Sequence, residues 1–120
     1  MLYSDDEYRL FSAELDGSSI VTIWSAMRPD NFDKKSMTYE ERKSYFFELL
    51  GRFLDEGKIR IGKHGKFLDG SIDEQISRYK IAFPKTEDEW KKKNEEIWFY
   101  EEDCPGGIVW IHENGYEDWT

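Results

Sequence analysis

A short pattern that starts helices occurs four times in this chain. A Ser or Thr is followed three residues later by Glu, at positions 4 and 7, 38 and 41, 71 and 74, and 86 and 89. In such a capping box the hydroxyl and the carboxylate accept hydrogen bonds from backbone N–H groups that the first helical turn leaves without partners. The pattern therefore predicts four helix starts, spread along the whole sequence.

The helix that opens at Thr38 has the clearest pattern. Between Thr38 and Glu56, aromatic and leucine side chains recur at spacings of three and four, and Gly57 follows as a left-handed stop. Gly51 lies inside this stretch, where a glycine costs about 1 kcal/mol relative to alanine. We therefore interpret Gly51 as a position where a second helix packs closely against this one.

Apolar spacing and helix stops set the bounds of the remaining helices. Residues 20–27 fit a helix that is capped by Ser18 or Ser19 and ends before Pro29. The β-branched start of this run would also suit a strand, but we favour the helix. The polar composition of residues 29–37 predicts a loop. The other helices are expected at about residues 5–15, 71–83 and 86–93.

The end of the chain, from Ile97 to Thr120, is rich in aromatic and β-branched residues and predicts a small antiparallel sheet. Asn114-Gly115 is typical of a two-residue hairpin turn, in which both central residues need positive φ. A looser turn at 103–107 would join strands at 97–100 and 108–111. The Asn-Gly turn sets the predicted register, with Glu113 opposite Tyr116, His112 opposite Glu117, Ile111 opposite Asp118, and Trp110 opposite Trp119.

A basic segment precedes the third capping box. Ile59 and Ile61 alternate there with basic residues, which predicts a short half-exposed strand followed by a turn at 63–66. A phosphate-binding loop is one interpretation. A solvated basic edge that offsets the acidic hairpin is preferred, because no glycine-rich nucleotide signature accompanies the segment. The basic residues concerned are Lys58, Arg60, Lys63 and Lys66.

Length and composition fit one α+β domain, residues 1–120, in which four or five helices pack against a C-terminal antiparallel sheet of about three strands. An aromatic content of 17% supplies a core although 36% of the residues are charged. No run approaches the roughly 18 apolar residues of a membrane helix, and the N-terminus lacks the basic start of a secretion signal. We therefore expect a soluble, cytoplasmic protein, and its single cysteine, Cys104, excludes an internal disulfide.

The acidic charge lies mainly in the last third of the chain. The net charge is −9, and residues 86–120 carry −8 of it, from eleven acidic residues and three lysines. Nucleic-acid backbones and anionic membrane surfaces would be repelled on average, whereas a basic protein would be attracted and steered. We therefore expect a basic protein as partner, with no nucleic acid and no membrane contact. The sequence leaves the oligomeric state open.

Two histidines and one cysteine offer little catalytic chemistry. His112 would face Glu117 across the predicted hairpin, as a base with an orienting carboxylate, and Cys104 lies at the other end of the same strand. A straight strand would hold Cys104 and His112 more than about 20 Å apart, so a structural cross-strand pair is preferred over a catalytic dyad. The spacing of possible ligands fits neither zinc nor a calcium loop. We expect no metal, no cofactor and no enzymatic activity.

Several segments together resemble a known bacterial family. They are Glu56-Gly57-Lys58-Ile59, Gly65-Lys66-Phe67-Leu68, Gly70-Ser71-Ile72-Asp73-Glu74-Gln75, and a tail Cys104-Pro105-Gly106-Gly107-Ile108-Val109-Trp110-Ile111 closing on Gly115-Tyr116-Glu117-Asp118-Trp119. Over nearly its full length the chain resembles the domain-of-unknown-function family numbered 596. The resemblance implies a small stand-alone cytoplasmic protein. It also implies an inhibitor role, because some members look like immunity proteins of contact-dependent growth inhibition, but it assigns no binding residue.

We therefore predict an immunity or inhibitor protein that binds and neutralises a basic toxin, such as a nuclease, through an acidic surface. Aromatic residues that stay exposed would add contacts at the centre of that surface. One alternative is a structural module that forms homodimers through the outer strand of the hairpin. A less favoured one is an enzyme that uses Cys104 with His112. The predicted contact residues are Glu101, Glu102, Asp103, Trp110, Glu113, Tyr116, Glu117, Asp118 and Trp119.

Overall fold

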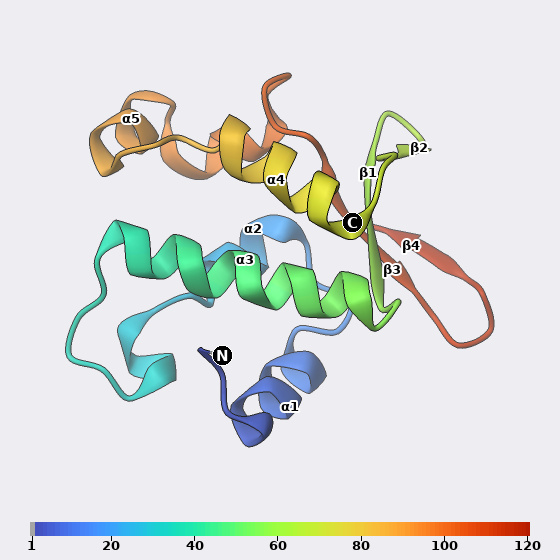
Figure 1. Cartoon of the computed structure of the whole chain (residues 1–120), viewed down its shortest axis with the longest axis horizontal. Coiled ribbons are helices and arrows are strands. Elements are labelled where there is room, and N and C mark those ends of the chain that lie inside the picture. The colour runs from blue at the N-terminus through green and yellow to red at the C-terminus, as the bar shows by residue number, and fades with distance from the viewer. Residues whose placement is uncertain (1) are drawn as a thin grey trace.

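The computed structural model describes residues 2–120 and combines helices with one four-stranded antiparallel sheet, so the predicted α+β class is confirmed (Figure 1). No helix within residues 2–120 is both long and apolar enough to cross a membrane. The elements are α1 (Asp5–Glu14), α2 (Ile20–Ser25), the 3₁₀ helix η1 (Pro29–Phe32), α3 (Tyr39–Asp55), β1 (Ile59–Lys63), β2 (Lys66–Phe67), α4 (Ile72–Ala82), α5 (Glu87–Lys92), the 3₁₀ helix η2 (Glu95–Tyr100), β3 (Gly107–Ile111) and β4 (Glu117–Trp119).

The capping signals start the helices that they predict. Ser4, Thr38 and Ser71 form complete capping boxes at the starts of α1, α3 and α4. At α5 the Thr86 hydroxyl accepts a hydrogen bond from the Glu89 N–H, while the Glu89 carboxylate accepts from the N–H of Lys85 instead of Thr86. The favoured helix at residues 20–27 is also present, as α2, and Ser19 caps it.

The strand predicted at residues 97–100 is wrong. These residues belong to η2, and β3 pairs instead with β1, which gives the strand order β2-β1-β3-β4. The neighbouring residues Trp98 and Phe99 are both buried. On a strand they would point to opposite faces, whereas the 3₁₀ turn lets both reach the same aromatic cluster, where each packs against Phe83.

The predicted register of the terminal hairpin is wrong by one residue. The observed partners are Trp110 with Asp118 and Ile111 with Glu117. The turn holds three residues, because the His112 N–H donates to the Tyr116 carbonyl (3.0 Å) and the Gly115 N–H donates to the His112 carbonyl (2.8 Å). Only the glycine of the Asn-Gly pair has positive φ, +83°, as in a type I turn followed by a bulge.

The turn with two positive φ values lies elsewhere. His64 and Gly65 have φ of +54° and +75° and connect β1 to β2, in the basic segment where the sequence predicts a turn. Basic residues therefore border a genuine hairpin, whose two strands are short.

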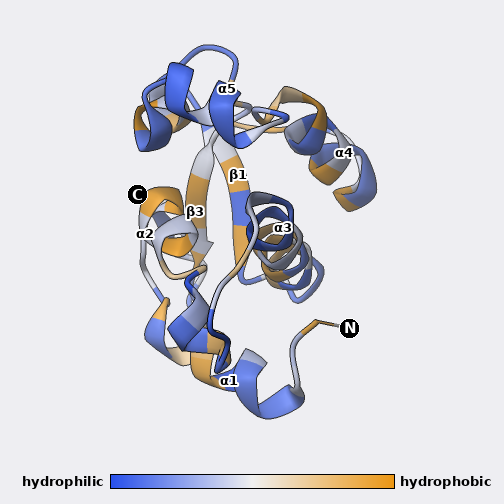
Figure 2. Cartoon of the chain, turned by 90° about the vertical axis from the view of Figure 1, so that its left-hand side faces the viewer, coloured by the Kyte–Doolittle hydropathy of each residue, from blue (hydrophilic) through white to orange (hydrophobic). Residues whose placement is uncertain are grey.

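Aromatic side chains fill the space between the helices and one face of the sheet. Trp24 of α2 packs against Phe46 of α3 and Trp90 of α5, with ring centroids 5.3 and 5.0 Å apart. From the sheet, Trp110 packs against Phe53 of α3, 5.4 Å away. In Figure 2, where α3 is seen end on, apolar colour marks parts of β1 and β3 beside it. The segment predicted as a polar loop at 29–37 also reaches this core, through the buried Phe32 of η1.

The opposite face of the sheet is covered by its own side chains. Trp119 stacks on Phe67 at 5.3 Å with an interplanar angle of 12°, and the Arg60 guanidinium lies 3.9 Å from the centroid of the Phe67 ring. Beneath them Val109 is only 1% exposed. A Cβ atom added to Gly62 would lie 2.5 Å from Trp119 Cζ3, so the glycine makes room for the stack.

The interpretation of Gly51 as a close-packing position is wrong. Within residues 2–120, a Cβ atom built there would have no neighbouring heavy atom within 4 Å, so no second helix packs closely against this position. Tight approach occurs at Gly62, on the sheet.

Candidate partner-binding groove

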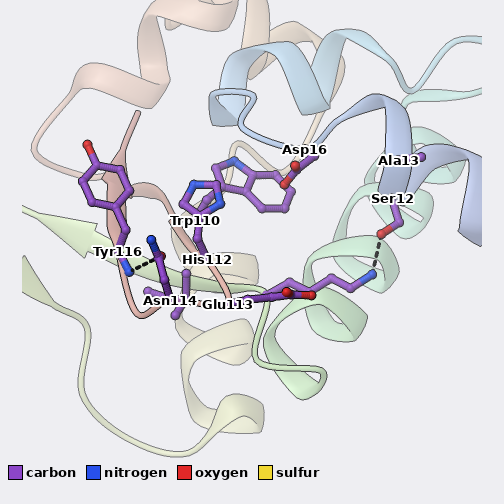
Figure 3. A pocket seen from close by; sticks show the side chains of 10 residues that line it. Ser12, Ala13, Asp16, Trp110, His112, Glu113, Asn114 and Tyr116 are labelled. Carbon is purple, nitrogen blue, oxygen red and sulfur yellow. Dashed lines mark hydrogen bonds between the residues drawn. The ribbon is translucent and has the colours of Figure 1, made fainter.

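A groove of about 860 Å³ separates the terminal hairpin from helix α1 (Figure 3). Two segments far apart in the sequence form its walls, one at the end of α1 and one spanning the β3–β4 turn. The side chains that matter for its chemistry are Ser12 and Asp16 on the first wall, Trp110, His112 and Tyr116 on the second, and Lys58 at one end.

Trp110 fixes the hairpin wall. Its side chain is 2% exposed, and its indole Nε1–H donates to the Ser18 carbonyl over 2.8 Å. This bond joins β3 to the segment between α1 and α2, so the two walls hold a set separation. Trp110, predicted as a contact residue, thus lies in the core and supports the groove from behind.

At one end of the groove, other residues of the chain balance the charge of Lys58. The Lys58 ammonium donates to the Ser12 hydroxyl and lies 3.2 Å from Glu56 Oε1. The Tyr8 hydroxyl donates to the same carboxylate over 2.6 Å. These contacts, the Tyr8 hydrogen bond first and Lys58 after it, lower the pKa of Glu56. The Lys58 ammonium therefore already has partners within the chain.

The other end of the groove is acidic. Asp16 is exposed and forms no ion pair with any of residues 2–120. The other carboxylate that lines the groove is Glu113. Asp118 lies outside the lining, with its Oδ2 3.5 Å from His112 Nε2 and 4.0 Å from where a methyl group added at Gly17 would lie. The His112 ring stacks beside Tyr116, with centroids 5.7 Å apart.

The expected pairing of His112 with Glu117 is wrong for the same reason as the register. Side chains alternate between the two faces of a strand, so a shift of one residue exchanges them. Asp118 now shares a face with His112, while Glu117 and Trp119 project on the far side of the hairpin.

The acidic residues Glu101, Glu102 and Asp103 lie at the opposite end of β3, beside the β1–β2 hairpin. The Lys63 ammonium donates to the carbonyls of Glu102 and Cys104, both over 2.7 Å, and lies 3.6 Å from the Glu102 carboxylate. Asp103 lies 3.8 Å from the Lys93 ammonium. The structure therefore does not bring the nine predicted contact residues together on one face.

Cys104 is buried and engaged with other residues. Its Sγ lies 3.1 Å from the Tyr79 hydroxyl, which itself donates to the Gly106 carbonyl over 2.7 Å. Burial raises the pKa of the thiol. Within residues 2–120, the hydrogen-bond partners of Cys104 do not include His112. The same part of the chain holds no group of three His, Cys, Asp or Glu side chains placed to bind a metal ion.

The sequence matches the model of a known protein family. The model of a family described as "Protein of unknown function, DUF596" matches residues 54–120, more than half of the sequence. The chain belongs to the DUF596 family. The matched region includes the sheet, Lys58 and the hairpin wall of the groove, whereas the wall formed by α1 precedes it.

A solved structure shares the DUF596 fold seen here. It is that of an uncharacterised protein conserved in bacteria, from Neisseria meningitidis, and its TM-score with this chain is 0.72. At 24% identity, the similarity covers 95% of this chain and 84% of that one, and it shows the fold alone. No curated protein matches the chain.

Sequence reasoning missed Asp16, Ser12 and the role of Lys58 in the groove. Asp16 lies about a hundred positions before the hairpin, and no local spacing links them. The only signal was the charge of Asp16 just before a glycine turn, which is common on protein surfaces.

Proposed function

We propose that this DUF596 protein is an immunity or inhibitor protein that binds and neutralises a basic toxin domain, such as a nuclease, through its acidic terminal hairpin. The observation that carries the proposal is the exposure of two hairpin carboxylates, Glu113 and Glu117, that have no cation beside them in the described part of the chain. Both are exposed on the hairpin, and within residues 2–120 neither has a cation within 4.0 Å. They are therefore available to a partner.

Exposed aromatic side chains lie beside these carboxylates. Tyr116 is 62% exposed and Trp119 is 42% exposed, so both side chains could bury more surface against a partner. Aromatic residues are enriched at interface centres, and surrounding charges raise the association rate and select the partner. A small hairpin that carries exposed carboxylates and exposed aromatic rings could bind a partner protein whose substrate-binding surface is cationic.

The proposal assigns no catalytic role to the chain. Its supporting observation is the burial of Cys104 at 1% exposure, which keeps the thiol from a substrate. Inhibition would follow from coverage of the toxin surface that otherwise holds nucleic acid.

Co-expression tests this function directly. The probe is the toxic C-terminal region of a secreted protein encoded beside the gene for this chain, produced with the wild-type chain or with Glu113→Lys or Glu117→Lys. We expect the wild-type chain to protect the cells that produce the toxic region. We expect each reversal to raise the dissociation constant of the complex between the chain and this region about tenfold or more. The matched control is Glu101→Lys, which changes the charge equally at the other end of β3.

Two results would contradict the proposal. In one, the chain neither binds nor protects against the neighbouring toxin. In the other, the hairpin reversals and the Glu101 control weaken binding to the same extent, which would mean that only overall charge matters.

A further inference from the structure

We propose that the outer edge of β4 docks an extended segment of the basic partner, which would join the four-stranded sheet as a fifth strand beside Glu117 and Trp119. This inference rests on the proposed function and deepens it, because it names the way in which the partner binds. Strand addition is a recurrent form of peptide recognition, in which backbone hydrogen bonds supply affinity and alternate side chains supply specificity.

The backbone of β4 has one edge without partners. The Tyr116 carbonyl and the Thr120 N–H bond to the other strand of the hairpin, over 3.0 and 3.2 Å. Backbone groups point alternately toward and away from a paired antiparallel strand, so those of Glu117 and Trp119 point away from β3. Within residues 2–120 no strand lies beyond β4, and no hydrogen bond joins these N–H groups and carbonyls to another residue.

This edge is open to solvent and short. Glu117 and Trp119 are both exposed. Since an antiparallel strand rises about 3.4 Å per residue, a stretch of about three residues would bond both N–H groups and both carbonyls. The added strand would therefore be one part of a larger interface with a folded partner.

The charge of the hairpin favours a basic segment at this edge. Residues 108–120 contain three acidic side chains, Glu113, Glu117 and Asp118, and no Lys or Arg. Within residues 2–120 no cation lies within 4.0 Å of the Glu117 carboxylate. Directly opposite residues of two antiparallel strands have Cβ atoms about 5 Å apart, so a Lys or Arg opposite Glu117 would form a cross-strand ion pair.

The same charge disfavours a second copy of the chain as the occupant. Two β4 strands that pair antiparallel through these backbone groups would place Glu117 opposite the Trp119 of the other copy, and Asp118 opposite its own counterpart. Like charges directly opposite each other destabilise a sheet, and each copy carries a net charge of −9. Charged edge strands are one means by which proteins avoid pairing with themselves.

Side-chain alternation predicts the sequence pattern of the docked segment. Residues opposite Glu117 and Trp119 would lie on the face of the sheet where Trp119 stacks on Phe67. A β-branched side chain opposite Trp119, which is 42% exposed, would pack on its ring. In an antiparallel strand the residue two positions later would meet Glu117, so the pattern is a β-branched residue followed at that spacing by Arg or Lys.

The test uses the full chain and three five-residue peptides. N-acetyl-Val-Thr-Arg-Thr-Lys-amide is the probe. In one control peptide the three central amide nitrogens are methylated, which removes hydrogen-bond donors and keeps the charge. In the other, Glu replaces Arg and Lys. Binding is followed by ¹H–¹⁵N NMR.

We expect weak binding of the probe, saturating at millimolar concentrations, and binding of both control peptides weaker by about tenfold or more. The backbone amide signals of Glu117 and Trp119 should shift downfield, because their protons gain acceptors. Those of Asp118 and Thr120, whose N–H groups face β3, should shift far less.

Single substitutions test the role of the carboxylate. Glu117→Gln should weaken the probe roughly threefold, as for an exposed ion pair. Glu101→Gln, at the other end of β3, removes the same charge and should leave the affinity unchanged. The Glu117 side chain forms no hydrogen bond or ion pair within residues 2–120, so its substitution should leave the signals of β3 in place.

Several outcomes would overturn the inference. They are no shift at Glu117 and Trp119, equal binding by either control peptide, equal shifts at Asp118 and Thr120, or equal effects of the two substitutions. Sedimentation equilibrium of the chain alone adds a further outcome. If the chain dimerises and the same two amide signals move with its concentration, the edge belongs to a second copy.

Failure of this inference is distinct from failure of the proposed function. In the complex with the toxic region, the Glu117 and Trp119 amides should become protected from hydrogen exchange. If the hairpin reversals abolish toxin binding while these two amides exchange as in the free chain, the inhibitor function stands and strand addition does not. If the probe pairs with β4 while the neighbouring toxin does not bind, the edge stands as a site for basic strands and the inhibitor function fails.

Discussion

Gly62 shows how one residue can decide the shape of a face. It lies on β1 directly under Trp119, and its lack of a side chain lets Trp119 reach Phe67 across two strands. The stack in turn buries Val109 on this face of the sheet. The glycine is thus required for space, since its φ is not in the left-handed region.

Replacement of Gly62 by alanine should destabilise the protein by about 1–3 kcal/mol, because the new methyl group meets the Trp119 ring and Val109 Cγ2 at 2.5 and 2.9 Å. Urea unfolding measures the change. Gly51→Ala is the control, and it should stabilise α3 by about 1 kcal/mol because the site has room and alanine favours a helix. Equal stability of Gly62→Ala and the wild type would show that the stack moves aside freely.

Glu56 gives a pH-dependent contribution to stability. Its pKa in the folded protein is lowered, first by the Tyr8 hydroxyl and then by Lys58, below the unfolded value of about 4.3. The contribution is therefore fully present above the unfolded pKa and is lost as the pH falls through the folded pKa. We expect the melting temperature of Glu56→Gln to be lower than that of the wild type at pH 7, with the difference vanishing in strong acid.

Glu14→Gln serves as the control for this measurement. Glu14 is exposed and forms no hydrogen bond or ion pair through its side chain within residues 2–120. Its substitution should shift the melting temperature by a similar small amount at every pH. A Glu56→Gln difference that persists unchanged in acid would contradict the assigned cause.

At the scale of elements, a lysine joins two segments that are distant in sequence. The Lys63 ammonium, at the end of β1, donates to the carbonyls of Glu102 and Cys104 in the segment that leads into β3. Lys63 therefore holds this segment against the β1–β2 hairpin. The basic edge predicted from sequence does offset acidic residues, but its main contacts are backbone carbonyls.

Lys63→Met should loosen this segment, because methionine keeps the side-chain stem and removes the donor. We expect a loss of about 1–3 kcal/mol in the free energy of unfolding and alkylation of Cys104 by iodoacetamide about tenfold faster than in the wild type. Lys66→Met is the matched control, since the exposed Lys66 side chain forms no hydrogen bond or ion pair within residues 2–120. Identical alkylation rates in all three proteins would contradict the role given to Lys63.

At the scale of the whole molecule, the acidic third of the chain is spread over a body of 40 × 35 × 22 Å. Figure 1 shows α5 and the β3–β4 hairpin at opposite ends. The charge of −8 in residues 86–120 is therefore divided among α5 and η2, the 101–103 segment and the hairpin. Because such a distribution acts over distance, it should steer a basic partner before the hairpin makes contact.

Ionic strength should therefore change mainly the association rate of the toxin complex. We expect the rate constant to fall about tenfold or more between low and physiological salt, while the dissociation rate changes far less. Stopped-flow fluorescence of the complex measures both rates. A salt effect carried mainly by the dissociation rate would instead indicate that the ion pairs act only at close contact.

The starts of the helices and the α+β class were determined by the sequence alone. A capping box joins residues only three positions apart, so Ser4, Thr38 and Ser71 specify helix starts wherever the helices later pack. The turn at residues 63–66 and the presence of a turn at Asn114-Gly115 were visible for the same local reason, although the type of the second turn was not.

Only the tertiary structure decided the register of the hairpin, the partner of β3 and the composition of the groove. An Asn-Gly pair permits more than one turn, and the observed turn places Trp119 over Gly62 and against Phe67, residues that no local pattern connects. The same shift moves Asp118 beside His112. Strand pairing and grooves depend on contacts between distant residues, whose free energies appear only when the chain is folded.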